Sequence, residues 1–149
     1  MIWFDLDNSP HVPLFAPVFK ELTKRSISYD VTARDFAQTL DLLKMWNIPH
    51  TAIGSHGGKN KIKKVLNLLK RKGELKKYIN TKYAGIAKPK ISVSHGSRTQ
   101  LVASKALGIH ISRMRISESL LMLMTPVYWR LYAHPVCLAT IMITEVKNY

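Results

Sequence analysis

Two hydrophobic patterns alternate along residues 1–111. Short apolar runs rich in β-branched and aromatic residues occur at 2–6, 27–32, 49–53, 90–93 and 109–111, and they predict five buried strands. The segments between them place apolar residues three or four positions apart, which predicts helices. Strands that alternate with helices through short connections predict a parallel sheet covered on both faces, an α/β fold of the Rossmann-like class.

Local signals suggest where each helix begins and ends. Two prolines predict that the first helix begins near Leu14 or is kinked at Pro17. Asp35 and Gln38 have the spacing of a capping box for the second helix. Gly73 predicts a break between basic helices over 60–72 and 75–83. A helix capped by Ser97 with Gln100 and closed by Gly108 follows the fourth strand.

From Ser112 the alternating rhythm stops. We therefore divide the chain into a Rossmann-like domain over 1–111 and a divergent tail over 112–149. Within the tail, residues 120–132 favour a helix, and residues 136–144 fit a strand or a helix.

The composition points to a protein of the cytoplasm. Among 149 residues there is one cysteine, Cys137, so no internal disulfide is available and a reducing compartment fits. The N-terminus lacks the cationic start of a secretory signal, and the uncharged run 131–144 is too short to span a bilayer.

The net charge of +14 is concentrated in one segment. Residues 59–90 carry 12 basic and 1 acidic side chains, whereas residues 1–58 carry 5 and 6. This segment predicts contact with an anionic membrane surface or a polyanion through basic side chains, at Lys61, Lys63, Lys64, Lys70 and Arg71. Nucleic-acid binding is a weaker alternative, because no recognition motif accompanies the charge. A third reading, which we favour over docking, is that Ile62, Val65, Leu66 and Leu69 pack on the sheet while the lysines are solvated.

Polar turns follow four of the predicted strands. We expect the sheet order 3-2-1-4-5, which brings the turns after the first and fourth strands together at the carboxyl end of the sheet. His11 is the candidate general base there, with a hydrogen-bonded loop histidine as the alternative. The turn 94–97 opens a helix whose N–H groups suit a phosphate or carboxylate, or are simply capped by Ser97. The candidate ligand-binding residues are Asn8, Ser9, Arg34, His56, Gly57, Ser94, His95, Gly96, Ser97 and Arg98.

Several familiar chemistries lack their motifs. The histidines do not share a metal-ligand spacing, so we expect no metal site. The glycine-rich dinucleotide and P-loop fingerprints and the nucleophile elbow of serine hydrolases are not present, and we expect no cofactor.

The four turns together resemble those of the prokaryotic family called "domain of unknown function 354". The resemblance rests on residues 3–12, 32–35, 54–58 and 92–98 and extends to about Ile111. That family is similar to the N-terminal half of B-fold glycosyltransferases and to the UDP-N-acetylglucosamine 2-epimerase group. The resemblance implies one half of a two-domain enzyme. The His11-x-Pro13 pattern also resembles the loop of the lipid-linked peptidoglycan N-acetylglucosaminyltransferases, which implies that His11 lies in the acceptor side of the cleft and that the ligand is a sugar or lipid-linked sugar acceptor.

The chain departs from the family pattern at two points. The family continues with an acidic, tyrosine-containing segment and a second domain for the nucleotide sugar, whereas residues 112–115 here read Ser-Arg-Met-Arg. Pro89-Lys90 also replaces the usual Pro-Asp. We therefore expect a truncated or frame-shifted relative that lacks the nucleotide-sugar half and is inactive alone. The resemblance leaves open the substrate and the oligomeric state.

Overall fold

The structure is a computed structural model that describes residues 1–55 and 61–113, with the side chains of 61–64 and 113 left aside. In chain order the elements are β1 (Ile2–Leu6), α1 (His11–Lys24), β2 (Tyr29–Asp35), α2 (Thr39–Met45), β3 (Thr51–Ser55), α3 (Lys61–Lys82), β4 (Ile91–Ser94), α4 (Arg98–Leu107) and β5 (His110–Arg113). The elements predicted in the tail at 120–132 and 136–144 lie outside the described residues.

The five strands form one parallel sheet in the order β3-β2-β1-β4-β5, which confirms the predicted fold class and strand order. β1 lies in the centre, with Phe4 opposite Val31 of β2 on one side and Val93 of β4 on the other. The loops after β1 and β4 therefore leave the same end of the sheet next to each other, and this is the switch point of the topology.

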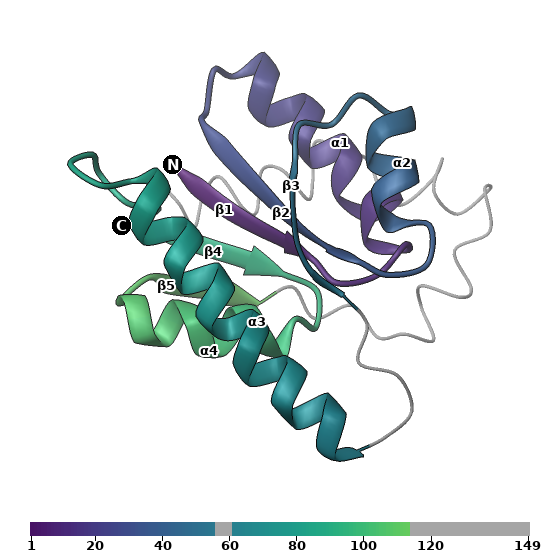
Figure 1. The fold of residues 1–149 in the computed structure, drawn as a ribbon. Helices are drawn as coiled ribbons and strands as arrows, with labels where there is room; N and C mark the ends of the chain where they lie inside the picture. Colours follow the sequence, from purple (N-terminus) through teal and green to yellow (C-terminus); the bar gives the residue numbers. More distant parts are fainter. Residues whose placement is uncertain (56–60, 114–149) are drawn as a thin grey trace.

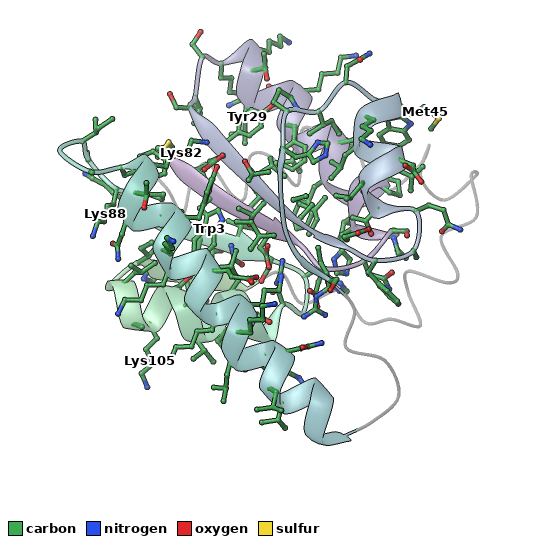
Figure 2. The ribbon with its side chains drawn as sticks, in the orientation of Figure 1. Trp3, Tyr29, Met45, Lys82, Lys88 and Lys105 are labelled. Carbon is green, nitrogen blue, oxygen red and sulfur yellow. The ribbon has the colours of Figure 1, made fainter. Side chains whose placement is uncertain are left out.

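Each face of the sheet packs against its own pair of helices (Figure 1). Ile2, Phe4 and Leu6 point from β1 into a core shared with α1 and α2. Trp3 points to the other face, toward α3 (Figure 2), and belongs to a core cluster with Leu75 and Ile79 of that helix. The apolar run of β1 thus reads as continuous because both of its faces are buried.

Two predicted helix boundaries are wrong. α1 begins at His11, so the start near Leu14 is wrong, and the helix continues through Pro17 because Val18 and Phe19 behind the proline are buried and hold it on the sheet. The alternative of a kink at Pro17 stays a prediction. The Asp35–Gln38 capping box does not form, because Asp35 still belongs to β2. Gln38 is the N-cap of α2 without a side-chain capping bond.

α3 is one helix of 22 residues and passes through Gly73 without a break. Leu75 and Ile79 beyond the glycine are fully buried, so packing outweighs the low helix propensity of one glycine. The helix cap predicted for α4 is confirmed: the hydroxyl of Ser97 accepts the N–H of Gln100, and Gly108 ends the helix in the left-handed conformation.

Candidate functional site at the carboxyl end of the sheet

A buried ion pair lies beneath the carboxyl end of β1. The Asp5 carboxylate is fully buried and accepts two hydrogen bonds from the Arg71 guanidinium of α3, at 2.9 and 2.8 Å. The hydroxyls of Thr32 and Ser97 donate to the same carboxylate at 2.7 and 2.6 Å. Four donors from three other elements or loops therefore converge on one side chain of β1, so the pair fixes α3 and the loop before α4 relative to the strand.

The prediction that Arg71 contacts a membrane or polyanion is wrong. Its side chain is 2% exposed, and its Nε donates to the carbonyl of Ile53 at 2.8 Å. A guanidinium satisfies a buried carboxylate through two parallel bonds, which explains why this cation of the basic helix turns inward. Asp5 was missed as its partner, although an acidic residue within an apolar strand indicates a buried charge that needs one.

A second set of charges surrounds Asp7, at the start of the loop after β1. Arg34 at the end of β2 approaches the Asp7 carboxylate to 3.2 Å, and Arg71 approaches it to 3.4 Å. Arg34 is one of the predicted ligand-binding residues, and its side chain is 18% exposed. Asp7 thus partly neutralises the charge of Arg34 at the carboxyl end of the sheet.

His11 and His95 join the two loops of the switch point. The N–H of Asp7 donates to Nδ1 of His11 at 3.2 Å, while Nε2 of His11 lies 3.2 Å from Nδ1 of His95. The two rings meet edge to face, with centroids 5.1 Å apart. The structure thus brings together two of the predicted site residues that stand 84 positions apart in the sequence.

The surroundings of His11 keep its imidazole neutral. Burial and, to a smaller extent, the neighbouring His95 lower the pKa of His11 to about 4, against an opposing effect of Asp5. Both ring nitrogens of His11 lie in hydrogen bonds within the protein. For His11 to accept a proton from a ligand, one of these bonds has to break, and its role as a general base stays a prediction.

The other predicted residues of the first loop support its shape. The side-chain oxygen of Asn8 accepts the N–H of Ser9 at 2.8 Å. The hydroxyl of Ser9 accepts the N–H of Gln38 at 3.0 Å, which ties the loop after β1 to the start of α2. Both residues are partly exposed at the rim of the sheet.

A hollow of about 390 Å³ opens where α4 begins. It is lined by Ser94, Gly96, Ser97, Arg98, Leu101 and Ile111. Four of these residues are predicted ligand-binding residues, and Arg98 is exposed in the first turn of α4. The hollow thus combines helix N–H groups, an exposed cation and two apolar side chains. The hydroxyl of Ser97 is already used by Asp5 and the helix cap.

Of the remaining predicted residues, the structure describes only the side chain of Lys70. His56 and Gly57 lie outside the described residues, as do the side chains of Lys61, Lys63 and Lys64. Lys70 is exposed on α3, 3.9 Å from Glu74. Within the described part of the chain, we find no group of three or more potential metal ligands, and no helix with the length and hydropathy needed to cross a membrane.

A larger hollow of about 620 Å³ lies between β3 and α3, away from the switch point. Lys82 on its wall donates to Asp30 at 2.8 Å, and Tyr78 and Tyr83 donate to the same carboxylate. Burial lowers the pKa of Lys82, but its hydrogen bonds to Asp30 and Tyr78 outweigh burial, so the pKa is raised. The polar groups here serve to attach the end of α3 to β2, so we place the candidate site at the switch point instead.

Comparison with known families decides the relationship suggested by the four turns. A family model described as "Protein of unknown function (DUF354)" matches residues 1–114. The chain belongs to this family. The DUF354 chain is also 38% identical over 56 residues to "Uncharacterized protein MJ0665" of Methanocaldococcus jannaschii, a match that covers 38% of this chain and 16% of that protein.

Solved structures with the same fold include a UDP-GlcNAc 2-epimerase and MurG. The UDP-GlcNAc 2-epimerase from Neisseria meningitidis, bound to UDP-GlcNAc, is 17% identical with a TM-score of 0.55, over 76% of this chain and 31% of the enzyme. MurG of Acinetobacter baumannii is 17% identical with a TM-score of 0.57, over 82% of this chain and 38% of the enzyme. The DUF354 chain therefore has the fold of one domain of the B-fold glycosyltransferase and epimerase group, and it spans about a third of these proteins.

Proposed function

We propose that the crevice at the switch point, between the loops after β1 and β4, binds a sugar-containing acceptor. The chain would then be the acceptor-side half of a glycosyl-transfer assembly. The observation that carries the proposal is the His11–His95 contact at 3.2 Å, which joins the loops after β1 and β4 beside the hollow at α4. In open parallel sheets, ligands bind at this position. The shared fold with MurG and the epimerase supports a sugar ligand.

Each candidate residue has a role that matches its surroundings. Gly96 and the first N–H groups of α4 suit a phosphate or carboxylate of the acceptor, and the exposed Arg98 adds a cation. The two histidines face each other across the loops and place a pair of imidazole rings beside the N-terminus of α4. Arg34, held by Asp7, is a further cation at the rim.

Transfer of a sugar also needs a half that binds the nucleotide sugar. The DUF354 match, residues 1–114, accounts for one Rossmann-like unit. We propose that this chain binds the acceptor and does not turn over a nucleotide sugar without such a half. We therefore expect no product when the chain is mixed with UDP-N-acetylglucosamine and an acceptor, and an assay of product formation measures this.

Calorimetry tests the ligand site directly. The chain is titrated with N-acetylglucosamine 1-phosphate, which carries both a sugar and a phosphate. We expect Arg98→Ala to weaken binding about tenfold, because one charge-assisted hydrogen bond is lost. Lys105→Ala is the matched control: it removes the same charge from the far end of α4, where the side chain points away from the fold (Figure 2). Equal affinity of both variants, or no binding by the folded wild type, contradicts the site.

A second candidate function, docking to an anionic membrane, is favoured by the exposed side of α3. The expectation that Val65, Leu66 and Leu69 pack on the sheet is wrong: they are 60, 59 and 54% exposed. The first turns of α3 extend beyond the sheet in Figure 1, which explains why nothing in the described chain covers them. Lys70 and Lys72 lie on the same helix, so apolar and cationic groups occur together, as in interfacial helices. Docking of α3 to a membrane would bring the chain to a lipid-linked acceptor held in that membrane.

Vesicle sedimentation separates this candidate from a plain charge effect. We expect the chain to bind vesicles that contain phosphatidylglycerol and not those of phosphatidylcholine alone. Leu66→Ser together with Leu69→Ser should release it. Ile86→Ser, at another exposed apolar residue, should not. Binding that the leucine variant retains and that a nucleic acid competes away would instead support the polyanion alternative.

A further inference from the structure

A long groove runs between the edge strand β3 and one face of α3. It consists of the hollow of about 620 Å³ and a smaller one of about 90 Å³, which share Gly54 and Glu74 in their walls. On the helix side, the lining residues recur at intervals of three and four positions: Asn67, Lys70, Glu74, Lys77 and Thr81. This helix face is about 21 Å long at the rise of an α-helix. The groove therefore has the length of an extended segment of about six residues.

β3 has an open edge along this groove. It is the last strand on its side of the sheet, and within the described chain it pairs with β2 alone. Ala52, Ile53 and Gly54 of this strand line the larger hollow. Charged side chains and prolines are among the features that protect edge strands from pairing, and Thr51–Ser55 contains neither. The edge can therefore accept the backbone of a further strand, whose alternate side chains would face the groove.

The charges along the groove favour an acidic occupant. Lys70 and Lys77 are exposed on its helix side, and Lys82 follows at the end of α3 (Figure 2). Glu74 lies 3.9 Å from Lys70, and Lys82 donates to Asp30. Lys77 has no hydrogen-bond or ion-pair partner among the described residues. A second copy of the chain, with its net charge of +14, would oppose these lysines, so the charge favours a different, acidic chain.

We propose that the groove between β3 and α3 binds an extended acidic segment of a partner protein. The segment adds a strand to the open edge of β3. An apolar side chain of the segment covers Ile53 and Tyr78, and acidic side chains beside it meet Lys70 and Lys77. The groove lies away from the switch point, so this interaction is independent of the proposed function.

Fluorescence anisotropy of the full chain with a labelled, capped hexapeptide of alternating valine and glutamate tests the groove. We expect this peptide to bind, and a peptide of alternating valine and lysine not to bind. Lys77→Glu should weaken binding about tenfold, because a cation beside the acidic segment becomes an anion. Lys76→Glu is the matched control: it makes the same charge change at the neighbouring exposed residue, which does not line the groove.

Two further measurements test strand addition without altering the protein. The same acidic peptide with every backbone nitrogen methylated keeps its charges but lacks N–H donors, and it should not bind. Hydrogen exchange of the amides in 51–55 should slow when the unmethylated peptide is added.

The contrary results are distinct. Equal losses in the two lysine variants would show attraction by the overall charge and overturn the groove as the site. Full affinity of the methylated peptide, unchanged exchange in β3, or no binding by the folded wild type would also overturn the proposal. Protection of the same amides that rises with protein concentration, without peptide, would make a second copy the occupant and contradict the acidic partner.

Discussion

At the scale of single residues, His11 couples folding to pH. Its pKa in the folded chain is about 4, mainly because of burial, whereas an unfolded histidine titrates near its ordinary value of 6.5. Between these values the unfolded chain binds a proton that the folded chain does not. The stability that depends on a neutral His11 is therefore fully present above pH 6.5 and is lost as the pH falls toward 4.

We predict that His11→Gln flattens this dependence. The free energy of unfolding of the wild type should fall by up to about 3 kcal/mol more than that of the variant over this range. Denaturant titrations of both proteins at a series of pH values measure the difference, and the other titrating groups largely cancel between the two. Parallel curves for the two proteins would contradict the prediction, because they would show that folding does not lower the pKa of His11.

Gly54 leaves the space that the Arg71 side chain occupies on its way to Asp5. Its backbone has φ = +75°, and a Cβ atom there would lie 2.8 Å from Cδ of Arg71. We predict that Gly54→Ala destabilises the fold by about 2–4 kcal/mol, because it adds backbone strain and displaces a buried cation from its partner. Gly85→Ala is the matched control, since its φ of +77° is similar and no atom lies within 4 Å of its Cβ position. Thermal unfolding of both variants measures the contribution of Arg71, and equal losses would refute it.

At the scale of elements, the sequence predicted those helix ends that depend on local interactions. The cap at Ser97 and the end at Gly108 were predictable because each depends on one side chain or one backbone conformation. The continuation of α3 through Gly73 was not predictable, because it depends on the packing of Leu75 and Ile79 against the sheet. The Asp5–Arg71 pair was not predictable either: 66 positions separate the two residues, and only the fold brings them together.

Gly73 supplies a direct test of the continuous helix. It is exposed within α3, and a Cβ atom there would meet no other atom within 4 Å. We predict that Gly73→Ala stabilises the chain by about 0.5–1 kcal/mol, because alanine loses less conformational freedom in a helix interior. Chemical denaturation measures the change. A destabilised variant would mean that the chain is not helical at this position.

At the scale of the whole molecule, topology made the candidate site predictable in outline. The strand order places the loops after β1 and β4 side by side, so residues from both were expected together, and His11 and His95 do meet. The direction of each side chain was not predictable. Arg71 and Ser97 turn toward Asp5, while Val65, Leu66 and Leu69 lie exposed on α3. The balance between burial and pairing that decides these directions depends on neighbours far away in the sequence.

The most direct test of the central claim is a map of backbone amide shifts as N-acetylglucosamine 1-phosphate is added to the nitrogen-15-labelled chain. We predict that the largest shifts fall on amides of the two switch-point loops, at Asn8, His11, Gly96 and Arg98. Arg98→Ala should reduce these shifts, and Lys105→Ala should not. Shifts confined to the exposed side of α3, or no shifts from a folded chain, would contradict a sugar-binding crevice at the carboxyl end of the sheet.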